Sequence, residues 1–341
     1  MRKPELPPSE QEDPTPPDYS SLPLEEIICR LRERAFTLGA HQSLSFLILD
    51  PDRCIGKYAG EEIRTDTERY LCRSWKSWTA LAELLGFRML TPRPYDRYRL
   101  ILRFAKLGEE SFHREKGRGK YSMESGFSRI RKEEEPAFLY YYTRALKRLK
   151  IEQRRRILVA GIHRGDELMP IRRMVSDAFE SMEIVGVDLA DDALQVAKRR
   201  FGDPLKTYCH DLNDLDALDL GRFDLMLSIG TLQSPGIELK PLIMRLVQKH
   251  LTPGGALLLG WPNSRWIDGE LLYGSRPPNY PFSELSLVIK DLFWIKKYLQ
   301  QHRYRVVITG REYLFLEATK ISGNSRSPHS RSTEASNDRP E

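Results

Sequence analysis

The order of apolar segments after residue 155 constrains the fold of this 341-residue chain more than any other feature. Short apolar strands alternate with helical segments, the strands being ILVAG, EIVGVDL, LKTYCHDL, FDLMLSIG and ALLLGW. This alternation predicts a mostly parallel sheet with helices on both faces. The last two strands, YRVVITG and EYLFLEATK, are joined only by a tight turn at Gly310–Arg311. A parallel crossover needs a dozen or more residues, so this pair is expected to form an antiparallel hairpin.

The expected fold class is therefore α/β: a doubly wound, seven-stranded, mostly parallel sheet with a C-terminal antiparallel hairpin. A small α+β unit precedes it, because LEEIICRLRERAF and SWKSWTALAELLGF have helical spacing and LSFLIL and YRLILRF have strand patterns. The N-terminal stretch is rich in Pro, Glu, Asp and Ser, which favours disorder. The expected domains are a disordered tail (1–22), the α+β unit (23–110), a basic polar linker (111–136), the α/β domain (137–320) and a second disordered tail (321–341).

The positive charge of the chain is concentrated in its middle. The net charge is +6, yet residues 88–156 alone hold 20 Lys and Arg against 9 Asp and Glu. A basic segment of this kind can face a polyanion such as RNA, and nucleic acid is therefore a candidate partner. A solvated surface explains the same charge equally well.

Cysteine usage and hydropathy bear on the compartment. The four cysteines form no CxxC pair and lie at no metal-ligand spacing from histidine, so no metal site is expected. They fit a reducing, cytoplasmic location. The charged N-terminus has no apolar stretch behind it, and no apolar run approaches the roughly 18 residues of a membrane helix. No signal peptide and no membrane association are expected.

Five motifs, in order, resemble the class I S-adenosylmethionine-dependent methyltransferases over residues 137–320. ILVAGIHRG is similar to the loop after the first strand, and EIVGVDL to the second strand with its terminal acid. CHDLND, FDLMLSIGTLQS and HLTPGGALLLG are similar to the three segments that follow in that family. The region from FLYYYTRALKR to YLFLEATK also resembles a little-described bacterial subgroup of such enzymes.

The resemblance implies a methyltransferase that uses S-adenosyl-L-methionine and releases S-adenosyl-L-homocysteine. Glycines let the backbone approach a cofactor without a Cβ clash, and an acid at a strand end can accept hydrogen bonds from a ribose diol. A second acid, Asp211, is expected to accept from the adenine amino group. The candidate cofactor residues are Gly161, His163, Gly165, Asp188, Leu189, Asp211, Leu212 and Ser228.

Each of these residues also has a purely structural interpretation. Gly161 and Gly165 can simply serve a tight turn, and Asp188 can flank a helix. Asp211 can cap the short segment that follows it. Asp166 and Glu167 are expected only to favour the dipole of the next helix.

Two residues depart from the family pattern. The acid that precedes the first glycine, which helps to hold the amino group of the cofactor, falls on Val159 here. The middle glycine of the loop is His163, which narrows the loop. Weak binding, an altered pose of the cofactor and lost catalysis are each compatible with these changes.

No catalytic residue can be assigned, because methyl transfer is an in-line displacement that mainly needs positioning. The fourth strand ends in SIGTLQS and lacks an Asn/Asp-Pro-Pro-aromatic run, which disfavours base amino-group methylation by that route. Cys209 is expected in the core rather than as a nucleophile. Aromatic and polar residues after the fourth and fifth strands form either a recognition surface or a packed loop. The candidate substrate residues are Gln233, Asn263, Arg265, Trp266 and Tyr273.

Three functions compete on this evidence. The first is an active methyltransferase whose acceptor is unidentified and is anionic or RNA if the basic segment guides it. The second is a catalytically impaired module that binds S-adenosylmethionine or RNA and retains the fold. The third is a nicotinamide-dependent oxidoreductase, which the missing GxGxxG pattern and the terminal hairpin disfavour. The sequence leaves the oligomeric state open.

Overall fold

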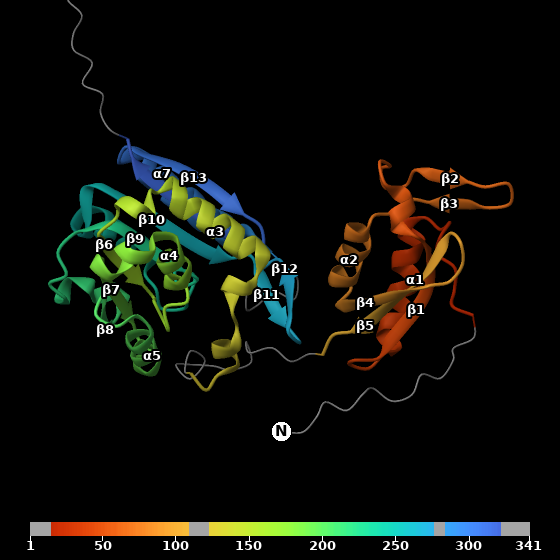
Figure 1. The fold of residues 1–341 in the computed structure, drawn as a ribbon, viewed down its shortest axis with the longest axis horizontal. Helices are drawn as coiled ribbons and strands as arrows, with labels where there is room; N and C mark the ends of the chain where they lie inside the picture. Colours follow the sequence, from red (N-terminus) through yellow and green to blue (C-terminus); the bar gives the residue numbers. More distant parts are fainter. Residues whose placement is uncertain (1–14, 109–122, 276–283, 322–341) are drawn as a thin grey trace, which may run out of the picture. The chain divides into compact units, whose positions relative to one another are not determined.

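The computed structural model describes residues 15–108, 123–275 and 284–321. The chain forms two compact units, shown in Figure 1. The first comprises residues 1–114 and 264–274, and the second comprises residues 115–263 and 275–341. The first unit is therefore formed by two segments that are far apart in the sequence. None of the helices in these described ranges has the length and apolar character of a membrane span.

The first unit is built on the three-stranded antiparallel sheet β1-β5-β4. Its aromatic core forms because alternate strand residues such as Phe46 and Phe104 meet Trp78 of the second helix. The elements of this unit are α1 (Leu24–Thr37), β1 (Ser43–Leu49), β2 (Glu62–Arg64), β3 (Arg69–Leu71), α2 (Trp75–Leu84), β4 (Phe87–Pro94), β5 (Arg99–Lys106), β11 (Ser264–Ile267) and β12 (Glu270–Tyr273).

The tail expected to be disordered over 1–22 is partly ordered, and this corrects the sequence analysis. Tyr19 is buried and stacks on Phe46, with 5.0 Å between the ring centroids. Its backbone N–H donates to the Leu47 carbonyl at 2.9 Å. The Pro17 and Ser20 carbonyls also accept backbone bonds, from Leu47 at 2.9 Å and Leu71 at 2.8 Å, so several contacts hold this segment on the core. Residues 1–14 and 322–341 lie outside the described part of the chain.

The second unit contains the predicted seven-stranded sheet, in the order β13-β14-β10-β9-β6-β7-β8. Five strands are parallel, and β14 pairs antiparallel with both β10 and β13, as the short turn requires. The predicted α/β class and the antiparallel terminal hairpin are confirmed. The strands are β6 (Arg156–Ala160), β7 (Glu183–Asp188), β8 (Leu205–Cys209), β9 (Phe223–Ile229), β10 (Leu251–Pro262), β13 (Tyr304–Gly310) and β14 (Tyr313–Lys320).

Helices cover both faces of this sheet (Figure 1). One face packs on α3 (Pro136–Arg148), α4 (Leu168–Val175) and α5 (Asp191–Phe201), and the other on α6 (Leu239–Arg245) and α7 (Ser286–Gln301). Neighbouring residues of one strand therefore enter different cores: Val159 joins the α3 side and Leu158 the α7 side. Burial on both faces explains why these strands read as continuous apolar runs.

Two predicted element boundaries shift. The segment LMPIRRMVSDAFESM (168–182) has helical spacing, but α4 ends at Val175 because Ser176 adopts φ +37°, and the 3₁₀ helix η7 (Ser176–Ser181) follows. The TPGG segment, which the spacing places between a helix and a strand, lies inside β10 as a bulge between Leu251 and Ala256. A bulge lets β10 pair with β9 on both sides of the irregularity.

The linker expected over 111–136 is ordered from residue 123, and residues 109–122 lie outside the described ranges. It contains the 3₁₀ helices η4 (Gly126–Arg129) and η5 (Lys132–Glu134). Arg164 of the loop after β6 donates to the carbonyls of Ser128 and Ile130, the latter at 2.6 Å. These bonds hold the described part of the linker on the second unit.

Candidate cofactor site

The loop between β6 and α4 begins at a glycine that the local packing requires. Gly161 has φ +78°, which favours glycine. A Cβ at this position would lie 2.0 Å from Oγ1 of Thr231, in the loop after β9. The Thr231 hydroxyl donates to the Gly161 carbonyl at 3.3 Å. The turn brings the ends of β6 and β9 into contact, which is the point where ligands bind in open α/β sheets.

Asp188 ends β7 and contacts the same loop. Its Oδ2 accepts from the His163 backbone N–H at 2.8 Å, and its Oδ1 accepts from the Ala190 N–H at 3.0 Å. Each carboxylate oxygen can accept a further bond, so the half-buried group keeps capacity for a diol. The structure thus brings Gly161, His163 and Asp188 to one place, as the sequence predicted.

His163 occupies the position of a family glycine and has φ +48°. Non-glycine residues reach this left-handed conformation only at a cost of about 1–2 kcal/mol. The loop therefore keeps a glycine-like backbone at this position, and the N–H bond to Asp188 supports it.

Gly165 serves helix packing in this structure. Its φ is +76°, and a Cβ would lie 2.7 Å from a ring carbon of Phe201 on α5. Next to it, buried Asp166 pairs with Arg164 at 2.6 Å and Arg200 at 2.7 Å. Burial alone would raise the pKa of Asp166, but the hydrogen bonds from Arg200 and Arg164 outweigh burial and lower it. Asp166 is thus an ion-paired structural residue.

The other candidate cofactor residues lie along the same sheet edge with mixed exposure. Asp211 caps the 3₁₀ helix η8 (Leu212–Ala217), because its Oδ1 accepts from the Asn213 N–H at 2.8 Å. Ser228 is buried and donates to the Ala160 carbonyl at 2.9 Å, tying β9 to β6. Leu212 is buried and Leu189 is exposed. The contacts of Asp211 therefore fit its structural interpretation as a helix cap.

Cys209 is exposed, and this corrects its expected place in the core. It ends β8, the edge strand, so one side of the strand has no neighbour to cover it. Its Sγ donates to the Leu189 carbonyl at 3.6 Å.

Glu167 is a buried acid beside this loop that sequence reasoning did not include among the candidates. It was assigned only to the helix dipole, yet it is 2% exposed and its Oε1 has no hydrogen-bond partner among the described residues. Burial raises the pKa of Glu167 to about 7, while Lys132 acts in the opposite direction. The available signal was its position at the end of the loop whose usual acid is replaced by Val159.

Further unpartnered polar atoms lie where β10 ends and β14 begins. Tyr313 pairs with Pro262, and a Cβ on Gly230 would lie 2.5 Å from the Tyr313 hydroxyl. Burial raises the pKa of Tyr313 well above its usual value. Four buried polar atoms there have no hydrogen-bond partner in the described part of the chain: the Tyr313 hydroxyl, Trp261 Nε1, Asn263 Oδ1 and Glu312 Oε2. Such atoms are rare in proteins and mark sites completed by water or ligand.

The five candidate substrate residues fall in both units. Gln233 and Asn263 belong to the second unit, where Gln233 Nε2 donates to the Gly230 carbonyl at 2.8 Å. Asn263 Nδ2 donates to the Arg311 carbonyl at 3.1 Å. Arg265, Trp266 and Tyr273 lie on the β11–β12 hairpin, which belongs to the first unit.

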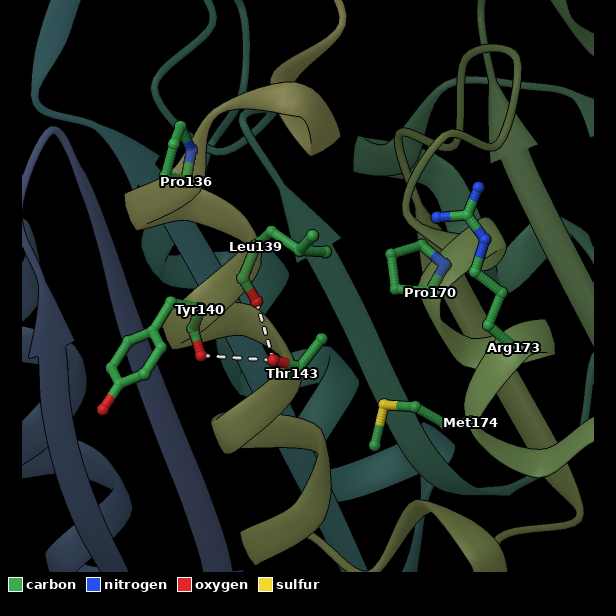
Figure 2. Close-up of a pocket in the computed structure, with 7 residues that line it drawn as sticks. All are labelled: Pro136, Leu139, Tyr140, Thr143, Pro170, Arg173 and Met174. Atoms are coloured by element: carbon green, nitrogen blue, oxygen red, sulfur yellow. Dashed lines mark hydrogen bonds between the residues drawn. The ribbon is translucent and has the colours of Figure 1, made fainter.

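A separate apolar groove of about 430 Å³ lies between α3 and α4. Figure 2 shows Leu139 and Thr143 of α3 on one side and Pro170 and Met174 of α4 on the other. None of the candidate cofactor residues lines it, so it is distinct from the strand-end site. The described residues hold no group of three or more potential metal ligands.

One family model matches part of the chain. Residues 157–255 match the family model described as a methyltransferase domain. The matched stretch runs from β6 to the start of β10 and includes the loop after β6, Asp188 and Asp211. No curated protein matches the chain.

Solved structures with a similar arrangement have low sequence identity. An O-methyltransferase family protein from Burkholderia thailandensis is 17% identical, over 60% of this chain and 64% of that one, with a TM-score of 0.39. A SAM-dependent methyltransferase from Aquifex aeolicus is 15% identical, over 57% and 98%, with a TM-score of 0.40. The N-methyltransferase NodS from Bradyrhizobium japonicum, in complex with S-adenosyl-L-homocysteine, is 17% identical, over 56% and 90%, with a TM-score of 0.38.

Proposed function

We propose that this chain is a class I S-adenosylmethionine-dependent methyltransferase and that it methylates an acceptor held at the strand-end edge of the second unit. The observation that carries this assignment of the site is the contact between the loop after β6 and Asp188. It joins a glycine turn to a strand-end carboxylate, the pair of groups that adenosyl cofactors need. The unpartnered buried atoms at the same edge fit a polar ligand.

The bound cofactor would supply an activated methyl group, and the protein would supply position. Asp188 would accept from the ribose hydroxyls, with Asp211 and the adjoining Leu189 and Leu212 beside the adenine. Gly161 would keep the loop close to the sheet, since no side chain fits there. Excluding water and fixing the line of attack are the main contributions of a protein to this displacement.

The impaired-module alternative is not favoured by the methyltransferase-domain match. That alternative was based on two departures from the family pattern, Val159 and His163. The His163 backbone adopts the conformation that a glycine would have, and its N–H engages Asp188. The nicotinamide alternative requires a glycine pattern that the loop does not have.

An anionic acceptor, RNA included, is a further proposal that rests on the charge of residues 88–156. The fold uses part of this charge internally. Arg88, Arg148 and Arg156 pair with Glu270, Glu317 and Glu183, respectively. A cytoplasmic location is likewise proposed, because the four cysteines are free.

Calorimetry with the intact protein tests the cofactor assignment. S-Adenosylmethionine is expected to bind and NAD is not, and Asp188→Ala is expected to abolish binding because the ribose acceptor is lost. Unchanged affinity in Asp188→Ala would remove the site. Transfer of a labelled methyl group into RNA, protein and small-molecule fractions of a cell extract then identifies the acceptor class, and label in none of them would contradict the proposed activity.

A further inference from the structure

A buried carboxyl group lies at the junction of the cofactor loop and α4. We propose that Glu167 holds the ammonium group of the cofactor's methionine moiety, the role left open by Val159. This inference rests on the proposed function. It assigns Glu167 the role of positioning the cofactor, although the family resemblance did not include this residue among the cofactor residues.

Val159 itself cannot bind an ammonium group. Its side chain is fully buried in the apolar core between the sheet and α3. Glu167 follows on the same loop, and the Tyr142 hydroxyl donates to its backbone carbonyl at 3.0 Å. This buried contact from α3 holds the backbone of Glu167 at the strand-end edge.

The acids beside Glu167 already have partners. Asp166 pairs with Arg164 and Arg200, and Asp188 accepts two backbone N–H groups. Among the described residues, Glu167 Oε1 has none, although its own backbone N–H bonds the carboxyl group. A buried carboxylate oxygen without a partner is unfavourable, and a cationic ligand removes that penalty.

The charged groups around Glu167 are consistent with a zwitterionic ligand. Asp166 and Asp188 disfavour its ionised form, and Lys132 of η5 favours it. Two phenols, Tyr142 and Tyr313, also lie close enough for Glu167 to affect their titration. Within the described residues, Lys132 Nζ donates to the Ile229 carbonyl at 3.4 Å. A cation and an acid therefore lie at the edge where a methionine carboxylate and ammonium would bind.

Two other acids in the described part of this edge have a buried oxygen without a partner. Glu312 pairs with Arg311 through its other oxygen, at 2.9 Å. Glu133 lies on η5 and is only half-buried. Glu167 alone among these three is almost fully buried, so it gains most from a cationic partner.

Two probes separate the amino-acid part of the ligand from the adenosyl part. S-Adenosyl-L-homocysteine carries both, whereas 5′-methylthioadenosine lacks the amino and carboxylate groups. In Glu167→Gln we expect calorimetric affinity for S-adenosyl-L-homocysteine to fall at least about tenfold, while affinity for 5′-methylthioadenosine is unchanged. In Asp188→Ala both affinities fall, because the shared ribose loses its acceptor.

Matched variants control for a loss of charge alone. Glu133→Gln removes the neighbouring acid, and Glu317→Gln removes a buried acid that Arg148 pairs in the middle of β14. Both are expected to keep wild-type affinity for S-adenosyl-L-homocysteine. Selective loss in Glu133→Gln, or none in Glu167→Gln, overturns the assignment. Failure of the wild-type protein to bind either probe would instead refute the proposed function.

Proton exchange gives a second readout that does not depend on activity. Binding of an ammonium group favours the ionised carboxyl group, so S-adenosyl-L-homocysteine should release protons at about pH 6.5. Calorimetry in two buffers of different ionisation enthalpy measures the number of protons released on binding. The release should be lost in Glu167→Gln and absent with 5′-methylthioadenosine, and equal release in wild type and variant would contradict the inference.

Discussion

At the scale of single residues, Glu167 should make the stability of the second unit depend on pH. Its pKa is raised from 4.5 to about 7, so the folded state binds its proton more tightly than the unfolded state. This contribution to stability is complete below pH 4.5 and is lost as the pH rises to about 7. The full effect is about 3–4 kcal/mol, since the pKa rises by about 2.5 and one pKa unit corresponds to about 1.4 kcal/mol.

Glu167→Gln should therefore flatten the pH dependence of the unfolding free energy between about pH 4.5 and pH 7. Gln stays neutral and loses nothing as the pH rises. Urea unfolding at several pH values measures the slope, and the difference between variant and wild type should favour the variant above pH 7. If the unfolding free energies of wild type and variant change with pH in the same way, the pKa of Glu167 is not raised by folding.

Gly161→Ala should destabilise the second unit and weaken cofactor binding together. A Cβ would contact Thr231 at 2.0 Å, and φ +78° adds a backbone cost of about 1–2 kcal/mol. Thermal unfolding and calorimetry with S-adenosyl-L-homocysteine measure the two effects. Gly254→Ala is the control, because nothing lies within 4 Å of a Cβ there. Adding Thr231→Gly should restore part of the stability, and a neutral Gly161→Ala would disprove the packing argument.

The sequence predicts single residues where one local rule decides their conformation. Gly161 and Asp188 follow from a strand-end pattern, and the structure brings them together through the His163 N–H. The position of Glu167 on the loop was visible in the sequence, but its burial was not, because it involves tertiary neighbours such as Tyr142, 25 residues away on another helix. Burial of a single acid is a tertiary property that the neighbouring sequence does not encode.

At the scale of elements, the β11–β12 hairpin could be predicted from sequence patterns, whereas the end of α4 could not. The segment was expected to be a lid or a packed loop, yet Asp268 and Gly269 have φ +52° and +78° and form a tight hairpin turn. An Asp-Gly pair between short apolar runs is a strong hairpin signal, so this element was predictable. The early end of α4 at Val175 was not, because a helical pattern continues to residue 182.

The ion pair that joins this hairpin to β4 should contribute only a little stability. Arg88 Nε donates to Glu270 Oε1 at 2.6 Å, with side-chain exposures of 38% and 43%. A double-mutant cycle of Arg88→Ala and Glu270→Ala should give a coupling energy of about 0.5 kcal/mol, as for other exposed pairs. Arg88→Ala alone should cost more than Glu270→Ala, because Arg88 also donates to the Asp268 carbonyl at 2.7 Å. Equal single-variant losses in urea unfolding would contradict this.

At the scale of the whole molecule, topology was more predictable than domain membership. The seven-stranded order follows from strand–helix alternation and one short turn. The membership of 264–274 in the first unit depends instead on contacts such as the Gly108 N–H with Asp268 Oδ2 at 3.2 Å, formed by residues 160 positions apart. No periodicity or composition in the hairpin itself indicates such partners.

Division into two units predicts a selective response to ligand. S-Adenosyl-L-homocysteine at about 100 times its dissociation constant should stabilise the unit that binds it by about 2.7 kcal/mol. For a unit of roughly 200 residues, this stabilisation raises the midpoint temperature of thermal unfolding by about 5–10 °C. Scanning calorimetry should therefore show two transitions, of which only the one belonging to the second unit moves. Asp188→Ala should abolish the shift, and Trp78→Ala, in the core of the first unit, should lower only the other transition. An equal rise of both transitions with ligand would contradict this prediction, because no cofactor contact is proposed in the first unit.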